Sequence, residues 1–117
     1  MRLLESAVVV LVTGVVMGCG GAPPPVDLLA ATEGSIRAAE EAGATKDPQG
    51  ALHLKLAKEQ VVEAKALMDD DDNEVAQRKL LRAEADADLA QAHADKAATL
   101  QEAGEAVRDL QKVKKSE

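Results

Sequence analysis

Residues 74–97 read EVAQRKLLRAEADADLAQAHADKA. Small or apolar side chains recur in this stretch at alternating spacings of four and three residues: Ala76, Leu80, Ala83, Ala87, Ala90, Ala94 and Ala97. This spacing places them on one side of an α-helix and is typical of a coiled-coil seam. Because most of them are alanines, we expect a second helix to approach closely, near the lower end of the usual ~8–10 Å interaxial range.

The same helix is expected to continue to about Val113, so we predict a long helix over residues 74–113. Its apolar spacing changes near the end, because Ala94, Ala97, Leu100 and Ala103 are all three residues apart. Spacings of three rotate the stripe backwards around the helix. Either the last third of this helix projects beyond its partner, or the two preceding segments together match its full length.

Two shorter helices are predicted upstream, over residues 27–43 and 48–68. The second is preceded by Asp47, an N-cap acceptor, and begins with Pro48, which is tolerated at the first helical position. The expected buried stripes are Leu29, Thr32, Ile36, Ala39 and Gly43 in the first helix, and Leu54, Ala57, Val61, Ala64 and Met68 in the second.

An acidic stretch, Asp69 to Asn73, separates the second and third helices. Carboxylates oppose the dipole at a helix C-terminus and favour the N-terminus of the next helix. Asp71 and Glu74 have the spacing of a capping box. The stretch lacks the glycine turn and the twelfth-position glutamate of an EF-hand, so we predict a capping turn with no metal.

Composition supports an all-α fold, because the chain is rich in alanine and has no Phe, Tyr or Trp. We expect one small domain over residues 26–117, built as an antiparallel helical hairpin or a three-helix bundle with a long third helix. Gly43, Pro48 and Gly50 indicate a true break between the first two helices and favour the bundle.

The N-terminal residues resemble a bacterial lipoprotein signal. An uncharged span from Ala7 to Val15 precedes Val16, Met17, Gly18 and Cys19, and Cys19 is the only cysteine of the chain. The four residues resemble a lipobox, which predicts cleavage after a signal peptide of residues 1–18 and acylation of Cys19 by chains such as palmitate. Arg2 is offset by Glu5, and Met17 is less common at its position. An ordinary secretory signal with a chance cysteine, or a short membrane-anchoring helix, is the alternative.

Residues 19–25 are expected to form a flexible linker, since Gly20 and Gly21 lead into three prolines. The residue after Cys19 is glycine. An aspartate at that position commonly retains lipoproteins in the inner membrane, so by analogy we expect this chain at the outer membrane, facing the periplasm. Two or three acyl chains would suffice for stable attachment.

The helical part resembles the DUF4398 domain, an Ala-rich module of bacterial envelope lipoproteins that is also found ahead of OmpA-like domains. The resemblance covers residues 31–98 and rests on IRAAEEAGA at 36–44, on Leu52, Leu56 and AKAL at 64–67, and on AEADADLA at 83–90. The family often has tyrosine before the proline, where this chain has Lys46 and Asp47. No enzymatic activity is assigned to the family, so the resemblance implies location and shape.

The sequence contains few residues and no motifs that are typical of catalytic sites. His53 and His93 are the two histidines, and we expect each to be a helix-surface residue. No nucleophile elbow, P-loop or zinc-binding helix is present. The formal net charge of −7 disfavours nucleic-acid binding, which needs clustered cations. We therefore expect neither an enzyme nor a cofactor.

The leading hypothesis is a lipid-anchored structural or interaction module of the cell envelope. Its expected partners are the membrane, through acyl chains on Cys19, and OmpA-like proteins or peptidoglycan, with weak homo-oligomerisation as a further possibility. The alternative is a peptidoglycan tether resembling the small murein lipoprotein. Against the tether, the sequence ends in Lys114-Lys115-Ser116-Glu117 with no terminal lysine, and helix breaks interrupt what would be one continuous helix.

Overall fold

The computed structural model describes residues 20–117, which form three α-helices and one short 3-10 helix. The elements are α1 (Val26–Glu41), η1 (Ala44–Lys46), α2 (Pro48–Asp69) and α3 (Asn73–Lys115). No strand occurs in this part of the chain. The predicted all-α fold with three helices is confirmed, and each helix end lies within two residues of its expected position. The predicted signal peptide and Cys19 lie outside the described residues.

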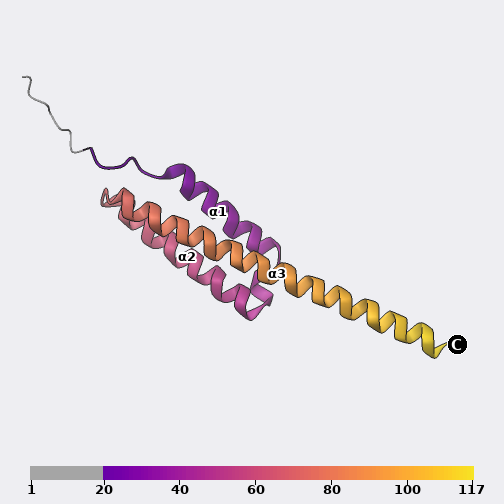
Figure 1. Ribbon diagram of the computed structural model, residues 1–117. Helices are drawn as coiled ribbons and strands as arrows, with labels where there is room; N and C mark the ends of the chain where they lie inside the picture. Colours follow the sequence, from indigo (N-terminus) through magenta and orange to yellow (C-terminus); the bar gives the residue numbers. More distant parts are fainter. Residues whose placement is uncertain (1–19) are drawn as a thin grey trace, which may run out of the picture.

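The helices form an up-down-up arrangement in which α2 runs antiparallel to α1 and α3 (Figure 1). α3 contacts both other helices over its first half and then continues alone to the C-terminus (Figure 1). Of the two arrangements left open by the sequence, the structure has the one in which the end of the third helix projects beyond its partners.

The core of the bundle is made mainly of alanine. Its fully or almost fully buried members are Ile36, Ala39, Ala44, Leu54, Ala57, Val61, Ala64, Ala76, Leu80, Ala83, Ala87, Ala90 and Ala94. These residues include most of the three predicted stripes. Thr32 is also buried, and its hydroxyl donates to the carbonyl of Leu28, which satisfies the donor within α1.

The turn between α1 and α2 depends on two glycines. Gly43 ends α1 with a φ of 91°, in the left-handed region that glycine adopts without steric cost. Gly50 lies in the first turn of α2, where an added Cβ would come within 2.7 Å of the Ala44 carbonyl oxygen. The Asp47 carboxylate accepts a hydrogen bond from the Gly50 amide at 2.7 Å, so the predicted N-cap is confirmed.

The turn between α2 and α3 differs from the predicted capping box. α2 ends in a Schellman motif, in which the Asp72 amide donates to Leu67 and the Asp71 amide donates to Met68. Asp71 has a φ of 61°, and Asp72 is the N-cap of α3 without a side-chain hydrogen bond. The prediction that Asp71 and Glu74 form a capping box was wrong, because Asp71 takes the left-handed position that reverses the chain.

The linker after Cys19 meets the bundle at this same turn. The side-chain amide of Asn73 donates to the Ala22 carbonyl at 2.9 Å, and Asn73 itself is buried. Residues 20–25 are otherwise non-helical and mostly exposed, as the glycine and proline content predicts. The linker therefore leaves the bundle at the end where α3 begins.

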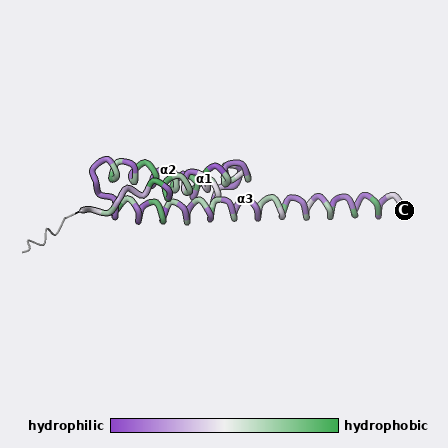
Figure 2. The backbone as a smooth tube through the Cα atoms, turned by 90° about the horizontal axis from the view of Figure 1, so that it is seen from above, coloured by the Kyte–Doolittle hydropathy of each residue, from purple (hydrophilic) through white to green (hydrophobic). Residues whose placement is uncertain are grey.

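The free part of α3, residues 97–115, is named here the distal arm. Its side chains are exposed apart from that of Ala97, including Leu100 and Leu110 at 63% and 70%. Apolar and polar residues alternate along it in the hydropathy view (Figure 2). Within residues 20–117, no helix has both the length and the apolar character needed to cross a membrane.

Candidate functional site

The residues predicted to direct acylation, Val16, Met17, Gly18 and Cys19, lie outside the described residues. The structure describes the linker that follows them, residues 20–25. Ala22 lies against the α2–α3 turn, so residues 20–25 meet the bundle at the end opposite the distal arm (Figure 1).

A cluster of polar side chains lies at the edge of the α2–α3 interface and is named here the polar layer. It contains Asp47, His53, Gln60, Asp86 and His93. Asp86 bonds the Nδ1 atom of His53 at 2.9 Å and accepts from the side-chain amide of Gln60 at 2.7 Å. The Nδ1 atom of His93 lies 3.9 Å from the carboxylate of Asp47.

The two imidazole rings of the polar layer are stacked. Their centroids are 5.7 Å apart, and the ring planes differ by 8°. The side chain of His53 is 22% exposed and that of His93 is 33% exposed, so both are partly covered by the neighbouring helix. We expected each histidine to be a helix-surface residue; both side chains are partly exposed, but the structure also brings the two rings together at the helix interface.

The antiparallel register of α2 and α3 explains why the polar residues meet. His53 and Gln60 are seven residues apart on α2, and Asp86 and His93 are seven residues apart on α3. Residues seven apart lie on the same side of a helix, and antiparallel pairing brings the earlier residue of one helix opposite the later residue of the other. This repeat of polar residues beside the apolar seam was the signal that our sequence reasoning missed.

The geometry of the polar layer favours a role in packing. Asp86 satisfies donors on α2 from a mostly buried position, and its own side chain is 14% exposed. The surface hollow that Asp47 lines extends towards Ala97 and Gln101, and neither histidine lines it. Among the described residues, no group of three or more His, Cys, Asp or Glu side chains is placed to hold a metal ion.

Ion pairs on the outside of the bundle connect the helices in addition to this layer. Lys58 pairs with Glu40 and Lys65 pairs with Glu33, which joins α2 to α1. Lys79 pairs with Glu63, which joins α3 to α2. These pairs are partly exposed, so each adds little stability on its own and mainly favours this arrangement of helices over others.

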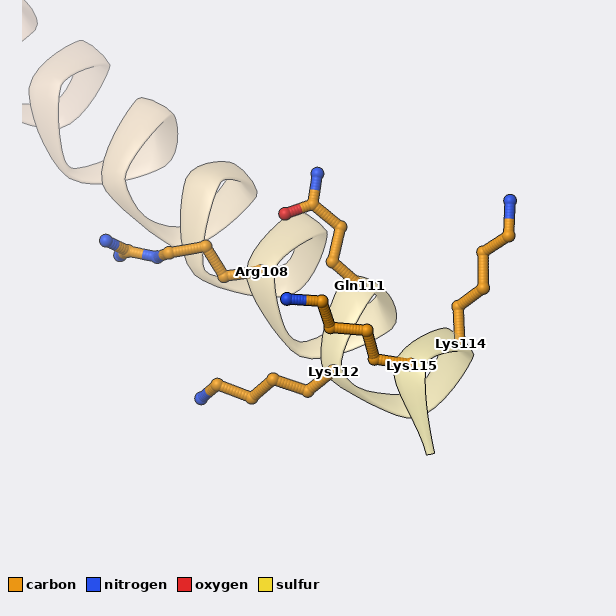
Figure 3. Close-up of a pocket in the computed structure, with 5 residues that line it drawn as sticks. All are labelled: Arg108, Gln111, Lys112, Lys114 and Lys115. Carbon is orange, nitrogen blue, oxygen red and sulfur yellow. The ribbon is translucent and has the colours of Figure 1, made fainter. Parts of the chain in front are cut away.

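The end of the distal arm carries a concentration of positive charge. Arg108, Lys112, Lys114 and Lys115 project from the last turns of α3 together with Gln111 (Figure 3). All five side chains come from one helix and spread in different directions, so the space between them is open to solvent (Figure 3). The basic end of the arm and the end of the bundle that Ala22 contacts are separated by the full length of α3, about 65 Å for its 43 residues.

Comparison with known families identifies the chain. Residues 27–112 match the model of DUF4398, a domain of unknown function. The match spans well over half of the chain, from the start of α1 almost to the end of the distal arm, so the protein belongs to the DUF4398 family. Neither a curated protein nor a solved structure matches the sequence.

Proposed function

We propose that this protein is a non-enzymatic, lipid-anchored envelope module that presents a free helical arm to partners at the periplasmic face of the outer membrane. The observation that supports the proposal most directly is the separation of the two ends. The linker that follows Cys19 is held at the α2–α3 turn by Asn73, and the exposed arm begins where the contacts of α1 and α2 with α3 end.

The bundle would act as a rigid base in this proposal. Three helices bound by an alanine-rich seam fix the direction in which α3 leaves the bundle, and 43 consecutive helical residues extend that direction without a proline. Anchoring at one end of such a base leaves the other end accessible. A packing role for His53 and His93 supports a structural rather than a catalytic module.

Fractionation of the cell envelope tests this proposal. The wild-type chain is expected in the outer-membrane fraction, and a Cys19→Ser variant is expected to leave it because the thiol that receives the acyl chains is gone. The Ser35→Ala variant removes a half-buried hydroxyl in α1, outside the predicted signal, and serves as the matched control. A Cys19→Ser variant that fractionates with the outer membrane as the wild type does would contradict lipid anchoring.

A peptidoglycan tether is the second candidate, favoured by the exposed lysines Lys112, Lys114 and Lys115 at the end of the arm. Covalent attachment to the wall would use a lysine amine, and these lysines lie in the last turn of α3, at the end opposite the linker. Digestion of purified cell walls with muramidase distinguishes the two candidates. A form of the protein that appears only after digestion would favour the tether.

A further inference from the structure

Asn73 is the one buried polar residue of the α2–α3 turn. Its side chain is 6% exposed, whereas its neighbours Asp72 and Glu74 are exposed. The side-chain amide of Asn73 donates to the carbonyl of Ala22, which lies 51 residues earlier in the chain, at 2.9 Å. A buried polar group costs free energy unless it is hydrogen-bonded. The contact with the linker therefore explains how the amide nitrogen of Asn73 tolerates burial.

Only half of the Asn73 side-chain amide is satisfied. Within residues 20–117, its Oδ1 atom is buried and has no hydrogen-bond partner. The linker forms one wall of the small hollow at this turn, because Gly21 and Ala22 line it together with Asn73 and its neighbours. Departure of the linker would open that wall and let water reach Asn73. The hydrogen bond to Ala22 therefore stabilises the docked linker, and the unpartnered oxygen destabilises it.

The linker is stiff, and little else holds it to the turn. Its three prolines restrict φ and lack an N–H donor, so they cannot pair with the bundle through their own amides. The carbonyl of Pro25 accepts from the amide of Leu29 at 2.9 Å, so the prolines lead directly into α1. Most of residues 20–25 are exposed. Among the described residues, the hydrogen bond that joins this linker to the turn is the one between Asn73 and Ala22.

We propose that residues 20–25 are a strap with a docked and a released state, and that Asn73 is the clasp that holds the docked state. The structure shows the strap docked. Because the burial of an unpartnered oxygen opposes the one hydrogen bond, the two states lie close in free energy and both are populated. Release leaves the bundle folded, since no residue of the linker belongs to its hydrophobic core.

The two states differ in how far the chain reaches from the base. Three residue steps separate Cys19 from Ala22, a reach of about 10 Å at ~3.3 Å per step. Seven steps separate Cys19 from Val26, where α1 begins, a reach of about 23 Å. If the chain is anchored through Cys19, as the proposed function holds, the docked strap keeps the α2–α3 turn near the lipid surface. Release would let the base move away from it.

Nuclear magnetic resonance of the full-length chain in a mild detergent tests the strap. The measurement is the heteronuclear ¹⁵N NOE of the Gly21 and Ala22 amides, which reports motion on the ps–ns timescale. We expect wild-type values between those of the three helices and those of a free chain end. The measurement does not depend on acylation of Cys19, so the strap can fail while the proposed function stands, and the reverse.

Asn73→Asp is the variant that opens the clasp. It removes the donor but keeps the shape of the side chain, and a carboxylate is favourable in the first turn of α3. The ratio of docked to released strap should fall about tenfold, which brings the NOE of Ala22 to the free-chain value. Asp69→Asn makes the reverse change at an exposed residue of the same turn and should leave the NOE as in the wild type. Circular dichroism checks that the bundle is intact.

A second variant acts from the linker and leaves the bundle unchanged. Pro23→Gly with Pro24→Gly makes the released linker more flexible, which favours release through chain entropy. The side-chain amide signal of Asn73 should then shift towards its position in an unfolded chain. Two results would overturn the proposal. A wild-type NOE equal to that of the helices would mean a linker that does not release, and an NOE that Asn73→Asp leaves unchanged would mean that Asn73 is not the clasp.

Discussion

Among the glycines of the described residues, Gly50 has the least room for a side chain. A Cβ there would meet the carbonyl oxygen of Ala44 at 2.7 Å and its Cα at 3.2 Å, and both belong to the backbone of η1. Because backbone cannot move aside as a flexible side chain can, we expect Gly50→Ala to push η1 away from α2. The predicted cost is about 1–3 kcal/mol, measured as a lower melting temperature.

Gly34→Ala is the matched control for this prediction. Gly34 also lies within a helix, but its added Cβ would meet only the end of the Arg37 side chain, at 3.9 Å. Alanine is the better helix former, so this change should leave stability unchanged or raise it by up to about 1 kcal/mol. If Gly50→Ala were also stabilising, the close approach of η1 and α2 would be incorrect.

Asp86 joins α2 to α3 through hydrogen bonds to His53 and Gln60. Replacing it with alanine leaves two partly buried polar groups on α2 without their acceptor. We therefore expect Asp86→Ala to lower the free energy of unfolding by about 1–3 kcal/mol, measured by chemical denaturation. Asp88→Ala removes an exposed carboxylate two residues away and should change stability by less than about 0.5 kcal/mol. Equal effects of the two changes would show that the hydrogen bonds of Asp86 do not stabilise the bundle.

At the scale of the element, the packing of α3 against α2 depends on small side chains. Ala87 is fully buried and Ala92 is exposed on the same helix. A leucine at position 87 must separate the helices, at a cost of about 1–3 kcal/mol, whereas a leucine at position 92 extends into solvent. Ala87→Leu should lower the melting temperature and Ala92→Leu should not, since leucine and alanine differ little in helix propensity. Indistinguishable melting temperatures would mean that the seam is not packed.

The helices and their seams could be predicted from sequence because one physical pattern dominates them. Alternating spacings of three and four identified Leu54, Val61 and Leu80 as buried, and Asp47 with Pro48 placed the start of α2. The polar layer needed a further step, in which the seven-residue repeats of His53 with Gln60 and of Asp86 with His93 are matched across two helices. It depends on the antiparallel register, which a pattern within one helix does not specify.

The conformation of the α2–α3 turn was the other feature that the sequence did not predict. Asp71 and Asp72 are identical in type, and sequence alone does not say which of two neighbouring aspartates takes the left-handed conformation. The structure assigns it to Asp71 and makes Asp72 the N-cap of α3. The candidate lipid site could be predicted only from the sequence motif that ends at Cys19. Acylation would be carried out by other enzymes that recognise this motif, so the fold of the bundle carries no signal for it.

At the scale of the whole molecule, the chain divides into a base and an arm. The base buries one side of α3 against α1 and α2, and the side chains of the arm beyond Ala97 are exposed on every side of the helix. Residues 20–25 meet the base at the α2–α3 turn, so this linker and the arm lie at opposite ends of α3 (Figure 1).

The central claim, that the protein is anchored in the membrane through its one cysteine, is tested most directly by the mass of its N-terminal peptide. Protein extracted from membranes is digested, and the peptide that contains Cys19 is analysed by mass spectrometry. We predict a peptide that begins at Cys19 and carries a diacylglycerol on sulfur, with an added acyl chain on its amine. A peptide with a free thiol, or one in which Gly18 still precedes Cys19, would contradict the account.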